Sequence, residues 1–395
     1  MHNLIISVSA FNGMNEYGGH YFSALTTARE LSKKHKVSVF VVGDFLPKTL
    51  AVNDVSVVFI RYHAGFFCVA PSGIKELVRS SGANVVVAFD MKAGVIFRLI
   101  SAQQSLGFIQ VKAGGPLPKT PYINNPHQVH FSKKDYDWAS KRIAYGKKVI
   151  SWVPNRVADT KPDELGIARL REQLAVAQDD IVLMRIGRID KKYKPAFVGA
   201  IESARVLRKN GFSVRLIMIG AVTHQDLYEY LKSIMSEEDV LLSDACYTKN
   251  ARRFLAMADL NLGVGRGFME GCAEGNYMLA MTAESKLPVV VDEGNIQELF
   301  SENFSMRGRS TRTDSERVSD LVNLAREVSS SSGGSSLSRG WFERYFDSGR
   351  ILDLYSPILD SAERNREMID FFVFFECTLF LLKKALRKVS MDKMV

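Results

Sequence analysis

The chain has 395 residues, 46% of them hydrophobic and 24% charged, proportions that are typical of a globular protein. A disordered chain, a coiled coil and a mini-scaffold are thereby excluded. The 52 Lys and Arg exceed the 43 Asp and Glu, and the net charge of +9 favours an anionic partner: nucleic acid, a membrane surface or a phosphate-bearing small molecule.

The first third alternates short β-branched runs with helical patterns, which predicts a parallel sheet covered on both faces. Residues 1–158 are therefore predicted to form one Rossmann-like domain. Strands are predicted at 4–11, 36–43, 55–62 and 83–90, with weaker patterns at 107–112, 127–132 and 147–154, and helices at about 21–34 and 74–80.

The alternation starts again after a polar stretch that ends at Asp163, so residues 159–328 are predicted to form a second Rossmann-like domain. Its first helix pattern ends at the C-cap candidate Gly211. Strands are predicted at 180–189, 213–220, 239–244, 259–265 and 288–293, and helices at 195–211, about 225–235 and 250–257.

The Ser/Gly-rich run 329–339 is typical of a flexible link. Beyond it, a helical pattern at about 340–360 returns the chain to a folded body, and residues 361–395 form a basic, amphipathic tail. Ligands of open α/β sheets bind at the carboxyl ends of the strands, and both sets of ends can face a cleft between the domains. The functional residues are therefore expected in the strand-to-helix loops.

Four cysteines lie far apart, with no CxxC pair and no histidine at metal-ligand spacing: Cys68, Cys246, Cys272 and Cys377. This favours isolated thiols in a reducing compartment. The N-terminal run lacks the basic start and cleavage site of a signal peptide, and no uninterrupted apolar stretch reaches about 18 residues. We expect a cytoplasmic protein.

The first loop of interest places Gly18 and Gly19 immediately before a helix. Adjacent glycines let the backbone approach a ligand closely, and the helix start offers unpaired N–H groups to an anion. A tight turn that needs positive φ is the alternative.

The second loop gathers five basic side chains directly after a strand: Arg185, Arg188, Lys191, Lys192 and Lys194. A guanidinium fork and an ammonium beside a helix start suit a diphosphate. A solvated basic loop is the alternative.

The third loop combines Gly263, Gly265 and Gly267 with Arg266, and Glu270 follows on the next helix. The glycines keep the backbone close to a ligand, and a carboxylate can accept hydrogen bonds from the neighbouring hydroxyls of a ribose.

In order and spacing, these pieces resemble the GT-B glycosyltransferases of glycosyltransferase family 4 over about residues 1–360. The matching pieces are Gly18-Gly19, KAGGP at 112–116, VPNRV at 153–157, GRIDKKYK at 187–194 and GRGFMEGCAEG at 265–275. NFSMRG at 303–308 is similar to a C-terminal signature of one bacterial subgroup.

The resemblance implies an α/β GT-B fold: two Rossmann-like domains that face a central cleft, an N-terminal acceptor domain and a C-terminal nucleotide-sugar donor domain, with a C-terminal helical extension. It implies that Arg188 and Lys194 contact the donor diphosphate, that Glu270 contacts its ribose, and that Gly265 and Arg266 also belong to the donor-binding residues. The acceptor or phosphate loop would comprise Gly18, Gly19, Lys112, Gly114 and Gly115.

The chain also departs from the family pattern. The first of the family's paired glutamates would fall at Leu262, and the proline that normally follows the glycine is replaced by Tyr277. The catalytic histidine of the first domain has no clear counterpart, so His20 and His127 are candidates.

The activity implied is retaining transfer of a sugar from a nucleotide-diphosphate donor to a glycan or lipid-linked acceptor, in bacterial surface polysaccharide synthesis. Fixed cations stabilise the negative charge that develops on the leaving diphosphate. Cationic side chains can take the place of a metal ion at the diphosphate, so we expect a metal-independent enzyme without a cofactor, in which the nucleotide sugar is a co-substrate.

Asp90, at the end of a predicted strand, is a candidate acceptor-binding residue or base, and capping of a nearby helix is the alternative. His63, His130 and His224 are interpreted as ordinary surface or core residues.

The tail segment 369–388 joins a dense apolar run to Lys383, Lys384, Arg387 and Lys388. Such a segment suits interfacial contact with anionic headgroups on the inner leaflet. Docking on the protein's own first domain or on a second subunit is the alternative.

Two other classes of protein were weighed. A catalytically inactive GT-B protein that binds nucleotide sugars or serves as a partner subunit stays open, because the first glutamate is missing. A dinucleotide-dependent oxidoreductase is disfavoured, since neither domain has GxGxxG followed by an acidic ribose ligand. Nucleic-acid binding is not expected, because no recognition motif appears.

Overall fold

In this computed structural model the chain is described at residues 1–11, 18–62, 72–115, 127–141, 148–330 and 335–365. Its internal contacts divide it into two units. Unit 1 joins residues 1–155 to the segment that begins at Ser348, and unit 2 comprises residues 156–347. The chain therefore enters unit 2 at Arg156 and leaves it at Asp347.

Unit 1 is built on a sheet whose described part has seven parallel strands in the order β3-β2-β1-β4-β5-β6-β7. Because the order runs outward from β1 and then reverses, the sheet is doubly wound. The strands are β1 (Asn3–Ala10), β2 (Lys36–Gly43), β3 (Ser56–Arg61), β4 (Val85–Ala88), β5 (Gly107–Lys112), β6 (His127–His130) and β7 (Val149–Trp152). The helices are α1 (Gly19–Ser32), α2 (Ser72–Ser80), α3 (Met91–Gln103), α4 (Lys133–Ser140) and α13 (Ile351–Arg364).

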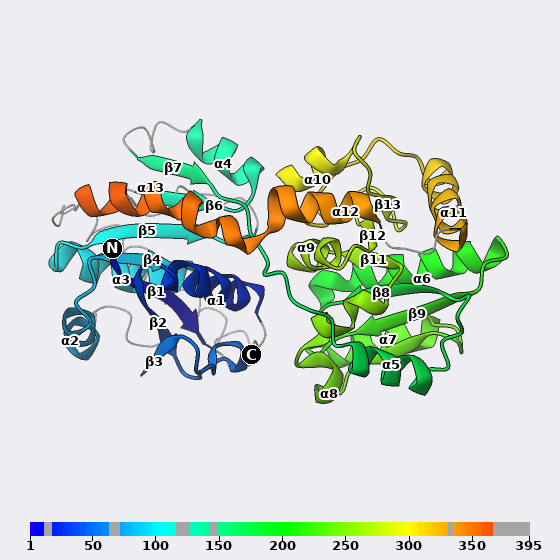
Figure 1. The fold of residues 1–395 in the computed structure, drawn as a ribbon, viewed down its shortest axis with the longest axis horizontal. Coiled ribbons are helices and arrows are strands. Elements are labelled where there is room, and N and C mark those ends of the chain that lie inside the picture. The colour runs from blue at the N-terminus through cyan, green and yellow to red at the C-terminus, as the bar shows by residue number, and fades with distance from the viewer. Residues whose placement is uncertain (12–17, 63–71, 116–126, 142–147, 331–334, 366–395) are drawn as a thin grey trace, which may run out of the picture. The chain divides into compact units, whose positions relative to one another are not determined.

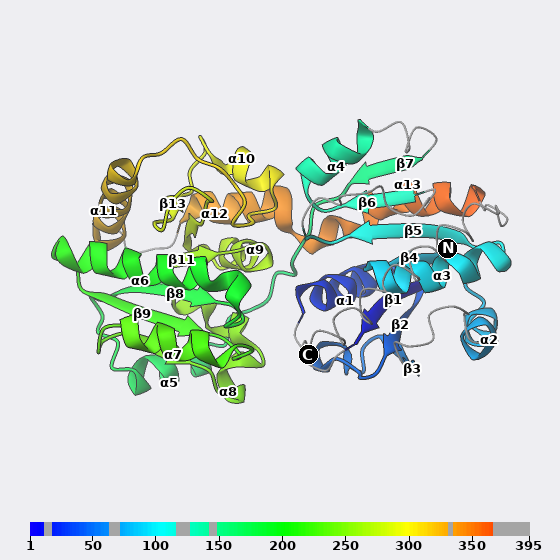
Figure 2. The ribbon, with the colours of Figure 1, turned by 180° about the vertical axis from the view of Figure 1, so that it is seen from behind.

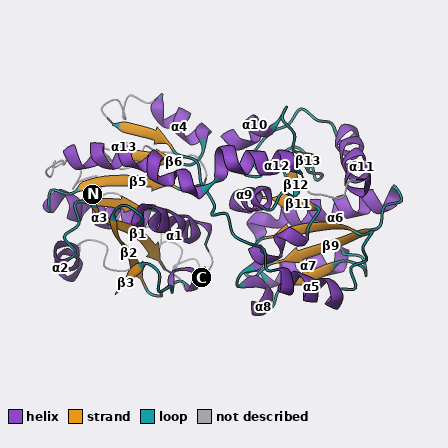
Figure 3. Cartoon of the chain, viewed as in Figure 1, coloured by secondary structure: helices purple, strands orange, loops and turns teal. Residues whose placement is uncertain are grey.

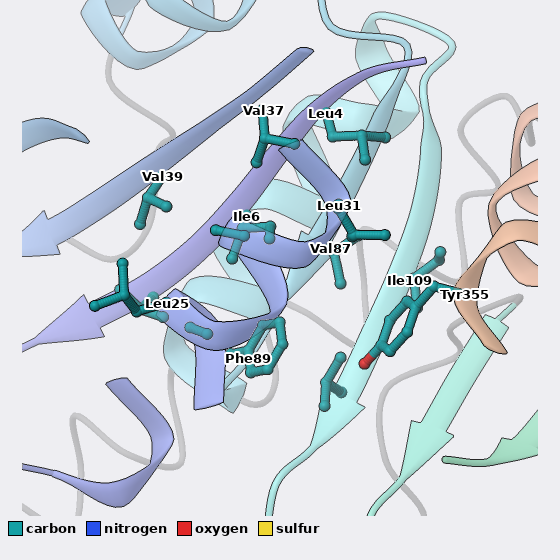
Figure 4. Close-up of a cluster of buried hydrophobic side chains, with 14 of the residues drawn as sticks. Leu4, Ile6, Leu25, Leu31, Val37, Val39, Val87, Phe89, Ile109 and Tyr355 are labelled. Carbon is teal, nitrogen blue, oxygen red and sulfur yellow. The ribbon is translucent and has the colours of Figure 1, made fainter. Parts of the chain in front are cut away.

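Alternation along β1 divides the core of unit 1 between the two faces of the sheet. Leu4, Ile6 and Val8 pack with α1 and α13, whereas Ile5 packs with α2 and α3. Figures 1 and 2 show α13, the last described helix, lying along β5. The C-terminal segment thus completes the core of unit 1, and Figure 4 shows Tyr355 of α13 beside Ile109 of β5.

Unit 2 repeats this plan with six described strands in the order β10-β9-β8-β11-β12-β13, of which only β13 is antiparallel to its neighbour. Figure 3 shows helices on both sides of the sheet. The strands are β8 (Ile181–Ile186), β9 (Val214–Ile219), β10 (Val240–Leu242), β11 (Leu260–Gly263), β12 (Tyr277–Ala280) and β13 (Val289–Val290). The helices are α5 (Glu164–Gln173), α6 (Lys194–Lys209), α7 (Gln225–Ile234), α8 (Ala245–Thr248), α9 (Arg266–Ala273), α10 (Ile296–Ser301), α11 (Asp314–Ser330) and α12 (Ser336–Trp341).

Several predicted elements differ in extent from the observed ones. The Ser/Gly-rich link is shorter than 329–339, because α11 continues to Ser330 and α12 starts at Ser336. The helix predicted at 250–257 is a 3-10 helix, Ala251–Met257. Gly211 follows the end of α6 with a φ of 87°, the left-handed conformation expected after a C-cap.

The returning segment is helical in pieces: a π-helix at Phe342–Phe346, a 3-10 turn at Ser348–Arg350 and then α13. Of the predicted tail 361–395, the first residues complete α13, and the rest lies outside the described residues. In the described part of the chain, no helix combines the length and apolar character that crossing a bilayer requires.

Tyr355 gives a test of how α13 docks. Its side chain is 1% exposed, and its hydroxyl has no hydrogen-bond partner among the described residues. We expect Tyr355→Phe to leave the free energy of unfolding unchanged or to raise it, since it removes a buried hydroxyl without a partner. Tyr355→Ala should lower it by about 3–5 kcal/mol through loss of the ring. Denaturant unfolding checks both variants, and a stability loss for Tyr355→Phe as large as that for Tyr355→Ala would contradict this packing.

Candidate functional site

The loop after β8 carries two of the predicted donor-binding cations beside the start of α6. Arg188 is partly buried, and its guanidinium lies 5.7 Å from the ring centre of Tyr193. Lys194 is the first residue of α6, and its Nζ lies 4.0 Å from the ring centre of Tyr230 on α7. Each cation is therefore held against an aromatic face at the carboxyl edge of the sheet. Sequence reasoning missed both tyrosines. Tyr193 lies in the predicted loop, but nothing in the sequence shows that its ring packs against Arg188, and Tyr230 approaches Lys194 only through tertiary packing.

The ionisation of Tyr193 reports the field of this loop. Burial alone would raise the pKa of its phenol, but the net shift is downward because Lys192 and Arg188 stabilise the charged form. A hydrogen bond from Arg188 acts in the same direction. The positive potential next to α6 is thus strong enough to outweigh desolvation, and it favours an anionic ligand.

Arg185 does not belong to the basic cluster that the sequence predicted. It lies within β8, 2% exposed, and its Nη1 donates to the carbonyl of Ile186 at 2.6 Å. Its guanidinium also packs on Phe197, and burial lowers its pKa to about 10. A side chain inside a covered strand points into the core, so Arg185 supports the sheet and is not part of the loop that carries Arg188 and Lys194.

The turn from β11 into α9 is the second part of the site. β11 pairs with β8, so this turn lies next to the Arg188 loop at the same edge. Gly265 has a φ of 56°, and a Cβ on Gly263 would lie 2.3 Å from the Cα of Phe268. Both positions need glycine, because one is left-handed and the other meets backbone. The Gly265 N–H donates to the carbonyl of Phe304 at 3.0 Å, so this group supports the turn, and the role of Gly265 in donor binding stays a prediction.

Arg266 and Glu270 form an ion pair with one another on α9. Arg266 Nε lies 2.8 Å from Glu270 Oε1, and their side chains are 15% and 17% exposed. Arg266 Nη1 also donates to the carbonyl of Arg156 at 3.3 Å. Sequence reasoning gave these two side chains separate partners, a phosphate and a ribose. Opposite charges four residues apart on a helix commonly pair, so the ion pair could have been predicted from the sequence.

In unit 1, the predicted glycine pair lies at the start of α1. Gly18 is the N-cap with a φ of −67°, and Gly19 has no left-handed φ, so the alternative of a tight turn is wrong. Among the described residues, a Cβ on Gly19 would meet nothing within 4 Å. His20 follows in the first helical turn, partly buried with its ring 3.9 Å from that of Tyr21. The space beside Gly19 is compatible with the close approach of a ligand.

Asp90 caps α3, the alternative that the sequence left open. One of its carboxylate oxygens accepts from the Ser9 hydroxyl at 2.6 Å and from the N–H groups of Lys92 and Ala93. The other accepts from the Ser9 N–H at 2.6 Å. Through these four hydrogen bonds, Asp90 connects β1 to the start of α3, and we assign it that structural role.

Lys112 supports its glycine loop from beneath. Its Nζ forms an ion pair with Asp135 of α4, and the two side chains are 5% and 3% exposed. The same Nζ contacts the carbonyls of Gly114 and Gly115 at 3.2 and 3.4 Å. The pair orients this loop at the end of β5, whereas the sequence predicted Lys112 as a ligand in its own right. Asp135 was missed, since nothing in the sequence links positions 23 residues apart. Pro116, the last residue of the KAGGP match, lies outside the described residues.

The two histidines of β6 have different surroundings. His127 begins the strand, at the amino edge of the sheet, and its Nε2 lies 3.0 Å from the hydroxyl of Ser361 on α13. His127 therefore lies away from the carboxyl edge of the sheet, and its candidate role in catalysis stays a prediction. His130 ends the strand, pairs in register with Lys112 and is 1% exposed. Burial lowers its pKa to about 4, against the opposing effect of Asp135 and with help from Lys112.

A separate cavity of about 640 Å³ lies at the C-terminal end of α9. Arg339 is one of its lining residues and donates hydrogen bonds to both carboxylate oxygens of Asp159 and to the carbonyl of Ala273. The cavity thus lies at the opposite end of α9 from Gly265. Of the cysteines, the described pair is free, and burial raises the pKa of Cys272. Among the described residues, no three His, Cys, Asp or Glu side chains gather in a way that could hold a metal ion.

Comparison with solved structures gives the fold. HepE from Anabaena, in complex with UDP and glucose, matches with a TM-score of 0.62 at 16% identity, over 91% of this chain and 99% of HepE. A glycosyltransferase from Rickettsia africae matches with a TM-score of 0.65 at 12% identity, over 92% and 98%. A protein from Listeria monocytogenes, assigned as a UDP-N-acetylglucosamine 2-epimerase, matches with a TM-score of 0.53 at 13% identity, over 94% and 100%.

No family model and no curated protein matches the sequence. The chain has the GT-B fold, an α/β architecture of two Rossmann-like units with a helical C-terminal region. This class of fold serves more than one chemistry, so the activity has to be argued from the site.

His130 predicts how stability depends on pH. Its pKa is about 4 when folded against 6.5 when exposed, so the unfolded chain binds more protons between these values. The contribution of His130 to the free energy of unfolding should therefore be complete above about pH 6.5 and decrease as the pH falls toward 4. Between pH 7 and 5 we expect His130 to account for a loss of about 2 kcal/mol.

Denaturant unfolding of the wild type and of His130→Gln at both pH values isolates this contribution, because all other groups are shared. The variant should lose less stability than the wild type on acidification. Equal losses would show that His130 is not buried in its neutral form.

Proposed function

We propose that the protein is a glycosyltransferase that moves a sugar from a nucleoside-diphosphate donor to a glycan or lipid-linked acceptor, with retention of anomeric configuration, in bacterial surface polysaccharide synthesis. The observation that carries the proposal is the positive edge of unit 2, where Arg188 and Lys194 flank the start of α6. Unit 2 is accordingly the donor domain of the proposal, and unit 1 the acceptor domain.

Diphosphate recognition follows from the chemistry of this edge. Arg188 supplies a planar fork that matches phosphate oxygens, and Lys194 supplies a compact charge. The start of a 16-residue helix adds unpaired N–H groups and a positive dipole end. Glu270, on the neighbouring turn, offers a carboxylate to the ribose hydroxyls. This supports the resemblance to glycosyltransferase family 4, and the complexes of HepE with UDP and glucose are consistent with it.

Transfer requires the enzyme to favour departure of the diphosphate. Positive charge develops at the anomeric carbon while negative charge moves onto the leaving phosphate. Cations that are already held in place, as Arg188 and Lys194 are by Tyr193 and Tyr230, stabilise that charge without reorganisation. The bond from the anomeric carbon to the phosphate oxygen breaks, the acceptor oxygen forms the new bond, and the leaving phosphate takes the acceptor proton. We propose that the reaction needs neither a metal ion nor a cofactor.

The tail segment 369–388 enters the proposal through its composition. Its basic residues after Leu382 favour contact with anionic headgroups, which would bring a lipid-linked acceptor close. Pelleting with vesicles that contain anionic lipid compares the full chain with one that ends at Asn365. Equal pelleting of the two would overturn membrane contact through the tail.

Nucleotide binding is tested by thermal shift with UDP, GDP and ADP. A ligand at 100 times its dissociation constant should add about 2.7 kcal/mol of stability to the folded protein. Arg188→Ala and Lys194→Ala should each abolish most of that shift while the apo protein melts as before. Lys209→Ala, an exposed lysine at the other end of α6, is the matched control and should respond like the wild type. An unchanged shift in Arg188→Ala would reject the diphosphate site.

Turnover separates an enzyme from an inactive binding protein. With a nucleotide sugar and a glycan or lipid-linked acceptor, we expect nucleoside diphosphate to be released only when acceptor is present, at an undiminished rate in EDTA. NMR of the product should show the donor's anomeric configuration. Binding without turnover over a broad panel would favour the inactive partner subunit, which Leu262 left open. Conversion of the sugar without acceptor would indicate an epimerase.

A further inference from the structure

The structure places Arg266 where it acts on Glu270 and not on the phosphates. The two residues are one helical turn apart on α9, and Nε to Oε1 is 2.8 Å. With side chains 15% and 17% exposed, the pair is largely shielded from water, so the contact is stronger than at an open surface. Burial lowers the pKa of Arg266, and Glu270 partly restores it.

The far side of the guanidinium is also held. Arg266 Nη1 donates to the carbonyl of Arg156 at 3.3 Å. Arg156 in turn donates from Nη1 to the carbonyl of Asp347 at 3.1 Å, and Val157 forms a bridge with Asp347. Arg266 therefore connects Glu270 to the two backbone segments at which the chain enters and leaves unit 2. A guanidinium fixed at both ends is not a mobile cation that can turn toward a diphosphate.

This arrangement leaves one carboxylate oxygen of Glu270 for a ligand. Oε1 is the oxygen that Arg266 engages, and no described residue donates a hydrogen bond to Oε2. A hydroxyl needs an acceptor whose position is fixed beforehand, because an ordered partner costs less entropy on binding. Arg266 supplies that order and also balances the negative charge that Glu270 would otherwise bring near a diphosphate.

We propose that Arg266 is a positioning residue that fixes Glu270 so that Oε2 accepts from a ribose hydroxyl, and that the pair makes the site selective for ribonucleoside diphosphates over analogues that lack both hydroxyls. The inference rests on the proposed function, since it assigns a ligand to the same edge of unit 2. It goes beyond that function in giving Arg266 a role through Glu270 in place of a direct phosphate contact.

The test compares the affinities of UDP, GDP and ADP with those of their 2′,3′-dideoxy analogues, measured by calorimetry on the full chain. The wild type should bind the best ribonucleotide about 10-fold more tightly than its dideoxy analogue, the loss expected for a hydrogen bond to a charged group. Arg266→Met should lower ribonucleotide affinity by a similar factor and leave the dideoxy analogue within about twofold of the wild type. Arg266→Lys should recover part of the loss.

The double variant Arg266→Met with Glu270→Gln should bind the ribonucleotide no more weakly than Glu270→Gln alone, because both changes remove one interaction. Arg339→Met, which breaks another ion pair of unit 2, is the matched control and should bind like the wild type. Apo melting temperatures report whether each variant is folded.

Equal losses of both nucleotide types in Arg266→Met would overturn the inference and indicate a direct phosphate contact. Equal wild-type affinity for both types would also overturn it, while nucleotide binding itself would stand. If the wild type bound neither type, the proposed function would fail, a result distinct from the other two.

Discussion

The site proposed in unit 2 depends on the tight turn from β11 into α9. The chain must reverse within Val264 and Gly265, and it does so because Gly265 takes a φ of 56° and Gly263 leaves room for the backbone of Phe268. The carbonyl of Phe304 accepts the Gly265 N–H, while the rings of Phe268 and Phe304 stack with centres 3.8 Å apart. Asn303 and Phe304 adopt left-handed φ values of 54° and 50°, a conformation that costs energy in non-glycine residues and persists where surroundings enforce it. The turn thus fixes the start of α9, the helix that carries the ion pair of Arg266 and Glu270.

In unit 1, the glycine loop at the end of β5 is stabilised differently, by a buried charge pair. Lys112 and Asp135 are both withdrawn from water, which costs several kcal/mol per ion unless geometry and further hydrogen bonds compensate. Here the ammonium also contacts the carbonyls of Gly114 and Gly115. The Lys112 ammonium thus holds the glycine loop in place through these contacts. In both units, the candidate site residues are of two kinds: those at the carboxyl edge of a sheet and those that support the backbone.

The division between these two kinds of residue explains what the sequence could predict. Alternating strands and helices predicted two α/β units, and the glycines and basic residues marked the loops at the carboxyl edges. The sequence did not separate Arg185 from Arg188, because the predicted strand at 180–189 contains both, whereas the observed strand β8 ends at Ile186. Nor could it find Tyr230, Asp135 or the carbonyl of Arg156, because each approaches its partner through packing between elements distant in the chain. Local pattern therefore predicted the place of the site, and tertiary contacts decided which atoms are available there.

The central claim is that a nucleoside diphosphate binds at the carboxyl edge of unit 2, and a crystal structure of the complex tests it most directly. The account predicts diphosphate oxygens within hydrogen-bond distance of Arg188 and Lys194, with a ribose hydroxyl on Oε2 of Glu270. Arg266 should stay on Oε1 of the same carboxylate. A nucleotide bound instead in the cavity lined by Arg339, with Arg188 and Lys194 away from phosphate, would contradict the account.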